Sequence, residues 1–174
     1  MNAMQSVKLD KVTANVGVGA SGQALENAFK LLETLTGSTP VKTKARRREP
    51  TFKLRKGDEI GVKVTLRGEK ARQFLSKALK ARENLVPARG IDGAGNVAFG
   101  VKEYIDFPGA KYDPNIGMIG FDVCVTLSKA GRRISRRRIA PRRMPAKQVV
   151  GREEARDFME KEFGAVFEEE QEEQ

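Results

Sequence analysis

The sequence predicts an α+β fold of two layers, in which amphipathic helices cover one face of a largely antiparallel sheet. Several segments alternate apolar and polar residues with the period of a β-strand. Other segments repeat apolar residues every three or four positions, as an amphipathic helix does. No further helix is predicted that could cover the polar face of the sheet, so we expect a partner molecule to cover it.

The first strand is predicted at residues 7–18, where apolar residues occupy every second position. A helix is expected at residues 23–35, because its leucines and an alanine share one side. Ser21 is the predicted N-cap of this helix. After Pro40, residues 41–45 are expected to form a short extended segment. The opening of the chain thus supplies one long strand and one covering helix.

A β-hairpin is predicted next. Its first strand is residues 51–55, with Phe52 and Leu54 facing the core. Residues 56–58 make the turn, and residues 59–67 return antiparallel. The returning strand carries aliphatic side chains on one face, and cations, a threonine and a glycine on the other. A face with cations and no acid suits phosphate groups, so we expect it to stay open to a partner.

The second half of the chain repeats this mixture of elements. A helix is predicted at residues 69–82, followed by a glycine-rich loop at residues 85–96. A short strand is expected within residues 97–105, and a long loop at residues 107–117, which contains prolines and glycines. Residues 119–128 alternate most clearly and are predicted to form a strand.

The last part of the chain changes sharply in charge. Residues 129–147 hold nine bases and no acid. A final helix is predicted at residues 152–163. Residues 168–174 are acidic and low in complexity, and we expect them to be a disordered tail. Residues 1–167 are predicted to form a single domain, since a chain of this length supports one core.

The charge of the chain indicates a polyanionic partner. The 174 residues include 33 Lys and Arg against 23 Asp and Glu, a formal net charge of +10. Residues 151–174 hold 3 bases and 10 acids, so residues 1–150 hold 30 bases and 13 acids, or +17. Such a positive body repels itself unless a polyanion neutralises it.

Composition also argues against several other classes of protein. The chain has no histidine, which removes the commonest general base and metal ligand. Its single cysteine, Cys124, allows no internal disulfide and fits a reducing cytosol. The N-terminus has no apolar signal region, and no apolar run approaches 18 residues, so neither export nor a membrane span is expected. We expect no catalysis, cofactor or metal.

One motif offers an enzymatic alternative. Residues 17–22, GVGASG, have the G-x-G-x-x-G spacing of a dinucleotide-binding turn, which would make the protein an NADP-dependent reductase. Lys42 and Lys44 stand where that motif wants an acid, although lysines could accept a 2′-phosphate. A hairpin follows instead of a second strand–helix–strand crossover. The glycines are therefore better explained by a tight strand-to-helix turn.

Basic residues gather in three places where RNA binding is expected. Residues 42–56 hold eight bases and one acid, and prolines bracket most of this run. Exposed aromatic platforms are few, so recognition should rest on phosphates and the shape of a folded RNA. The predicted sheet face carries Lys11, Thr13, Asn15, Lys63, Thr65 and Arg67. Further contacts to the RNA backbone are expected from Lys42, Lys44, Arg132, Arg133, Arg136, Arg137 and Arg138. The bases lie on strands and loops rather than on an amphipathic helix, so no membrane partner is expected.

Several motifs together resemble a known family. They occur in the order KVTANVGVGASG, LTGSTPVKTKARR, RKGDEIGVKVTLRG, GNVAFGVKEYIDFPGAKYDPNIGMIGFDVCV and REEARDFMEKEFG. Their order and spacing resemble the large-subunit ribosomal protein L5 family, in its archaeal branch, over about residues 7–164. The resemblance implies a cytoplasmic, non-catalytic ribosomal protein that binds 5S rRNA and docks it to 23S rRNA in the central protuberance, beside neighbouring ribosomal proteins.

The resemblance also assigns roles to parts of this chain. Asn15, Thr65 and Arg67 match positions on the sheet face that meets 5S rRNA. The basic loop that approaches the peptidyl-site tRNA corresponds to Arg46, Arg47, Arg48, Lys53 and Arg55. The loop that bridges to the head of the small subunit corresponds to residues 107–117, with Pro108, Lys111, Tyr112, Asp113 and Pro114.

Overall fold

The computed structural model describes residues 3–168. Its centre is a sheet of five strands in the order β2-β3-β1-β6-β5, and every neighbouring pair is antiparallel. The strands are β1 (Val7–Gly17), β2 (Val41–Lys44), β3 (Glu59–Leu66), β5 (Asn96–Val101) and β6 (Phe121–Lys129). The prediction of an α+β fold with a largely antiparallel sheet is confirmed.

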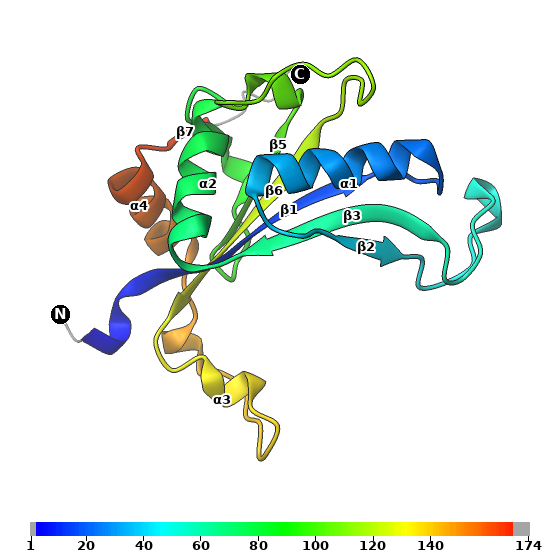
Figure 1. Cartoon of the computed structure of the whole chain (residues 1–174). Helices are drawn as coiled ribbons and strands as arrows, with labels where there is room; N and C mark the ends of the chain where they lie inside the picture. The colour runs from blue at the N-terminus through cyan, green and yellow to red at the C-terminus, as the bar shows by residue number, and fades with distance from the viewer. Residues whose placement is uncertain (1–2, 169–174) are drawn as a thin grey trace, which may run out of the picture.

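Helices α1 (Gln23–Thr36), α2 (Gly68–Lys80) and α4 (Arg152–Phe163) pack against the sheet, as Figure 1 shows. Helix α1 lies against β3, whereas α2 and α4 lie against β1. Their apolar stripes are buried, and Gly37 ends α1 in the left-handed conformation that glycine adopts without strain. The three helices were predicted at nearly these positions from their periodicity.

The core lies between these helices and one face of the sheet. Val12 pairs with Leu66 and Val16 with Val62 in the antiparallel register of β1 and β3, and all four are at most 3% exposed. Three rings, Phe74, Phe107 and Phe121, extend the core, with centroids 5.2–6.4 Å apart. Alternation along the strands therefore identified the buried face correctly.

The predicted first strand of the hairpin is wrong. The start of this segment belongs to a 3-10 turn (Pro50–Phe52), and Leu54 makes only an isolated bridge, to Glu49. Lys53 adopts a left-handed backbone conformation with φ 56°, which no strand can continue through. Phe52 is accordingly 71% exposed rather than buried. The hairpin partner of β3 is β2, so a longer loop connects the two strands of the hairpin.

Three further predictions need correction. Gly22, not Ser21, is the N-cap of α1, and no side chain caps that end. Residues 85–96 are not all loop, because β4 (Leu85–Pro87) pairs in parallel with β7 (Val166–Glu168). Glu168 therefore belongs to a strand and not to a tail, while residues 169–174 lie outside the described residues. Strands β4 and β7 are three residues long and far apart in the sequence, so no periodic pattern in the sequence indicates them.

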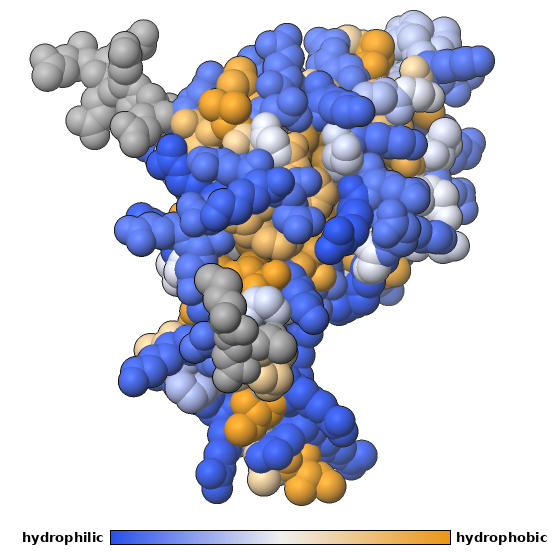
Figure 2. All heavy atoms as spheres, turned by 90° about the vertical axis from the view of Figure 1, so that its left-hand side faces the viewer, coloured by the Kyte–Doolittle hydropathy of each residue, from blue (hydrophilic) through white to orange (hydrophobic). Residues whose placement is uncertain are grey.

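Two basic segments project from the body (Figure 1). The hairpin loop, residues 45–58, connects β2 to β3. The basic arm, residues 129–147, contains the short helix α3 (Arg133–Arg136) and the start of the 3-10 turn Ala146–Gln148. Figure 2 shows that the arm is largely hydrophilic, with small hydrophobic patches near its end. Between residues 3 and 168, no helix is long and apolar enough to cross a bilayer.

Candidate nucleic-acid interface

The polar face of the sheet is centred on the pairing of β1 with β3. Thr13 lies opposite Thr65, and Asn15 lies opposite Lys63. Thr65 and Lys63 are exposed, whereas Thr13 and Asn15 are half-buried. Because side chains alternate along a strand, these four polar residues share the face opposite the buried valines. The structure thus brings together side chains that the sequence predicted on one surface.

The polar face continues across β6, where the sequence analysis expected no particular role. Asp122 lies opposite Asn15, and Cys124 lies opposite Thr13. Both side chains are exposed, so the middle of this face carries an acid among its cations. Burial, and next the charge of Asp122, raise the pKa of the Cys124 thiol, which keeps it protonated at neutral pH. Among residues 3–168, no group of three or more His, Cys, Asp or Glu could hold a metal ion.

One end of the polar face is organised by Asp10, which the sequence analysis did not identify. Its carboxylate accepts a hydrogen bond from Arg67 at 2.9 Å and one from Arg136 at 2.9 Å, and Arg132 lies 3.7 Å away. Lys11, the next residue, is half-buried. Burial pushes the pKa of Asp10 upward, but the hydrogen bonds and charges of Arg136 and Arg67 outweigh it and hold the pKa below its ordinary value.

The two lysines of β2, both predicted to contact RNA, differ in their surroundings. Lys42 lies opposite Val62, and its ammonium pairs with Glu26 of α1 and Glu59 of β3. The hydrogen bond to Glu26 is the main cause that raises the pKa of Lys42. Lys42 therefore already has acidic partners on the helix side of the sheet. Lys44 is exposed at the start of the hairpin loop.

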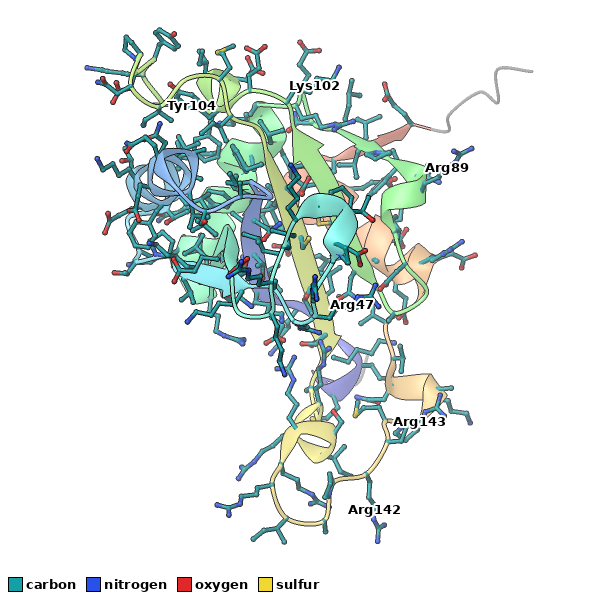
Figure 3. All side chains as sticks on the ribbon, turned by 90° about the vertical axis from the view of Figure 1, so that its right-hand side faces the viewer. Arg47, Arg89, Lys102, Tyr104, Arg142 and Arg143 are labelled. Carbon is teal, nitrogen blue, oxygen red and sulfur yellow. The ribbon has the colours of Figure 1, made fainter. Side chains whose placement is uncertain are left out.

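The hairpin loop is closed by backbone hydrogen bonds. Ala45 donates to Asp58 (2.8 Å), and Gly57 donates back to Ala45 (3.0 Å). Beyond this closure the five predicted cations are all exposed: Arg46, Arg47, Arg48, Lys53 and Arg55. Figure 3 shows Arg47 on this loop, well separated from Arg142 and Arg143 of the basic arm. The loop thus presents positive charge at a distance from the arm.

The basic arm is tied to the body at its base. Lys129 is only 6% exposed at its side chain and donates to Glu154 of α4 at 2.7 Å. The Gln148 side-chain amide donates to the Ala130 carbonyl, at 2.8 Å, which joins the two ends of the arm. Beyond the base, the predicted residues Arg133, Arg136, Arg137 and Arg138 are exposed, and Arg132 is half-buried.

The loop at residues 107–117 has a defined shape although it contains no helix or strand. The buried Tyr104 hydroxyl accepts a hydrogen bond from the Asp113 backbone N–H at 2.9 Å, and the Asp113 carboxylate accepts one from the Asn115 N–H. This arrangement leaves Tyr112 57% exposed beside a cavity of about 510 Å³ between the loop, α1 and α2. The other predicted bridge residues Pro108, Lys111 and Pro114 are exposed, and Asp113 is half-buried.

The glycine-rich turn, residues 17–22, does not form a dinucleotide site. The amides of Val18 and Gly19 both donate to the Ile60 carbonyl, at 3.0 and 2.8 Å. Dinucleotide-binding turns belong to parallel strand–helix–strand units, whereas every pairing of β1 is antiparallel. The turn therefore connects β1 to α1, and the reductase alternative has no support.

Three of the residues that shape this surface escaped the sequence analysis. Asp10 occupies a β-bulge, Phe52 is exposed by a left-handed residue, and Tyr104 is buried so that its hydroxyl can hold a loop. Asp10 is visible in the sequence as an isolated acid within the first predicted strand, but its contacts with Arg67 and the basic arm are not. The signals for Phe52 and Tyr104 depend on backbone geometry that spacing does not reveal.

Comparison with known proteins identifies matches over nearly the whole chain. Residues 2–55 match a family model described as ribosomal protein L5, and residues 59–167 match the model of the C-terminus of the same ribosomal family. The large ribosomal subunit protein uL5 of Methanosphaera stadtmanae is 46% identical over 168 residues, covering 97% of this chain and 100% of that protein.

Similar proteins come from other archaea as well. The uL5 protein of Sulfurisphaera tokodaii is 45% identical and covers 96% of this chain and 95% of its own length. That of Pyrobaculum aerophilum is 47% identical, covering 92% of this chain and 90% of its own length. The matches include both projecting segments as well as the sheet.

Proposed function

This chain belongs to the ribosomal protein L5 family, and on that premise we propose that it is a structural component of the cytoplasmic large ribosomal subunit that binds 5S rRNA and docks it to 23S rRNA. The family is structural and not enzymatic. The observation that carries the proposal is the open polar face formed by β1 and β3. Thr13 lies opposite Thr65 on this face, and Asn15 lies opposite Lys63. No helix of residues 3–168 covers these side chains.

The mechanism is neutralisation of phosphates by a rigid surface. Lys63 and Arg67 supply positive charge, while Thr13, Asn15 and Thr65 supply hydrogen-bonding groups for phosphate and ribose oxygens. The helices on the other face hold the strands in place, so the backbone that carries the polar side chains is fixed before RNA arrives. The basic arm adds arginines whose planar guanidinium groups bind phosphate oxygens in pairs.

The two loops are proposed to contact other parts of the ribosome. The hairpin loop carries six exposed cations at a distance from the sheet, which suits the phosphate backbone of the peptidyl-site tRNA. The loop at residues 107–117 presents Tyr112 and Lys111 on another part of the molecule, which suits an intersubunit bridge to the head of the small subunit. Neighbouring proteins of the central protuberance complete the set of partners.

The direct test is filter binding of the full chain to 5S rRNA over a range of salt concentrations. Affinity should fall steeply with salt, because each neutralised phosphate contributes about −0.9 to the log–log slope on duplex and about −0.7 on single strands. A Lys63→Gln and Thr65→Ala double variant should weaken binding without lowering the melting temperature. Val64→Ala is the matched control, since it lies between them on the buried face and should destabilise the fold. Binding to 5S rRNA with no salt slope would overturn the proposal.

A further inference from the structure

Asp10 joins two parts of the molecule that are remote in sequence. Its carboxylate contacts Arg67 at the end of β3 and Arg132 and Arg136 of the basic arm. Arg67 also donates to the Asp10 backbone carbonyl at 3.3 Å. One acid therefore holds three guanidinium groups, two of which belong to a segment more than 120 residues away along the chain.

A β-bulge places Asp10 where it can do this. The pairing of β1 with β6 shifts register between Leu9 and Lys11, so one residue is left unpaired. A bulge redirects the side chain of the extra residue, and the Asp10 side chain is 16% exposed beneath the three arginines. The carboxylate is thus fixed by the sheet, whereas the arginines of the arm approach it from outside.

The cluster keeps a net positive charge and unused donors. Three guanidinium groups and one carboxylate sum to +2. Each arginine has five N–H donors, and contacts with other residues of 3–168 use at most two of them on any one arginine. Arg67 and Arg136 are 57% and 45% exposed at their side chains, so a ligand can reach them. Such a group can bind the phosphate of a nucleic-acid backbone.

We propose that Asp10 is a positioning residue that joins the end of the sheet face and the basic arm into one phosphate-binding site. The ligand is a backbone phosphate of folded RNA, and the site rests on the proposed function of RNA binding. Asp10 holds the arginines in the orientation that binds phosphate, so its negative charge increases affinity for a polyanion. Simple charge counting predicts the opposite, because removing an acid from a basic surface should strengthen RNA binding.

The test compares two acids on the same side of the sheet. Asp10→Asn and Asp122→Asn remove the same charge, but Asp122 forms no ion pair with an arginine of residues 3–168, and its exposed carboxylate lies opposite Asn15. Binding of each full-length variant to 5S rRNA is measured at several salt concentrations. We expect Asp10→Asn to weaken binding about three- to tenfold, and Asp122→Asn, which removes an acid from the polar face without releasing an arginine, to tighten it.

A double-mutant cycle separates positioning from loss of structure. If Asp10 acts through the arm, Asp10→Asn should have a much smaller effect on RNA affinity in an Arg132→Gln/Arg136→Gln background. Asp10→Glu, which keeps the charge, should restore part of the affinity. Thermal melting shows whether Asp10→Asn stays folded; if it does not, the Arg136→Gln and Asp10→Glu variants carry the test.

The outcomes are distinct. Wild-type protein that does not bind 5S rRNA would overturn the proposed function itself. Wild-type protein that binds, with Asp10→Asn equal to or tighter than it, would overturn only the role of Asp10. Equal losses from Asp10→Asn with and without Arg132 and Arg136 would also contradict it, because the acid would then act independently of the arm.

Discussion

The hairpin loop and the basic arm are alike in composition but differ in how they are attached. Within residues 3–168, no ion pair ties a side chain of the hairpin loop to the body, and the loop is closed by its own backbone. The arm is held by two acids of the body, Asp10 and Glu154. The ion pairs with Asp10 and Glu154 fix the direction in which the arm projects. The hairpin loop has no such ion pair within residues 3–168, so it can adjust to the molecule that it binds.

This difference predicts that the two projections serve different RNAs. A segment docked beside the polar face can add its charges to the RNA bound there. A loop far from that face contributes little to the same RNA and remains available for another one. Variants of each segment can test this division, and the largest effect is expected from the arm.

Neutralising the arm should weaken 5S rRNA binding far more than neutralising the hairpin loop. We compare two triple variants to glutamine, one at Arg132, Arg136 and Arg137 and the other at Arg46, Arg47 and Arg48. The arm variant should lose more than tenfold in affinity, about 2–3 kcal/mol, and reduce the salt slope by about 2–3. The loop variant should lose less than about threefold. Filter binding measures both, and equal losses would remove the distinction between the two segments.

The base of the arm should matter for stability. Glu154→Gln leaves the Lys129 ammonium, 6% exposed, without its anionic partner. Loss of a partner from a buried charge is costly, but the carboxylate is half-exposed, so we expect about 1–2 kcal/mol lower free energy of unfolding. Asp157→Asn is the matched control in the same helix, because the Lys161–Asp157 pair is 77% and 63% exposed. Urea unfolding should show almost no change for this control.

The same ion pair predicts a pH dependence. The hydrogen bond from Lys129, and next the one from the Gly151 backbone, hold the pKa of Glu154 below its ordinary value. A carboxyl whose folded-state pKa is depressed stabilises the fold above its unfolded pKa and loses this contribution as pH falls through the folded value. The difference in unfolding free energy between wild type and Glu154→Gln should therefore shrink in acid. A difference that is constant from neutral to acidic pH would show that the charge of Glu154 is not involved.

The hairpin loop should matter for tRNA instead. In assembled ribosomes, the glutamine triple variant of the loop should retain peptidyl-site tRNA a few times less well, since three exposed cations are removed. The arm variant is not a suitable control, because it should reduce incorporation of 5S rRNA. Lys30→Gln, an exposed lysine on α1, is the better control for loss of surface charge. Unchanged tRNA retention would refute the assignment of the loop.

The sheet face, the hairpin loop and the Asp10 cluster differ in how far the sequence could predict them. Strict alternation placed Thr65 and Lys63 on one face and Val64 on the other, because strand geometry allows no other arrangement. The same reasoning failed at Phe52, where one left-handed residue, Lys53, breaks the alternation. It also could not find the Asp10 cluster, because a β-bulge and a contact across 126 positions depend on tertiary structure. Periodicity therefore predicts faces, whereas the attachment of projecting segments requires the structure.

The smallest effect is expected at the ring that the sequence analysis placed in the core. Phe52 lies in the middle of the hairpin loop and is 71% exposed. Phe52→Ala should therefore change the free energy of unfolding by less than about 0.5 kcal/mol. Phe74→Ala, which removes a ring 4% exposed in the aromatic cluster, should cost about 3–5 kcal/mol. An exposed ring flanked by cations can stack on a nucleotide, so tRNA retention should fall about twofold in Phe52→Ala. A large loss of stability would instead mean that the loop packs onto the body and is attached much as the arm is.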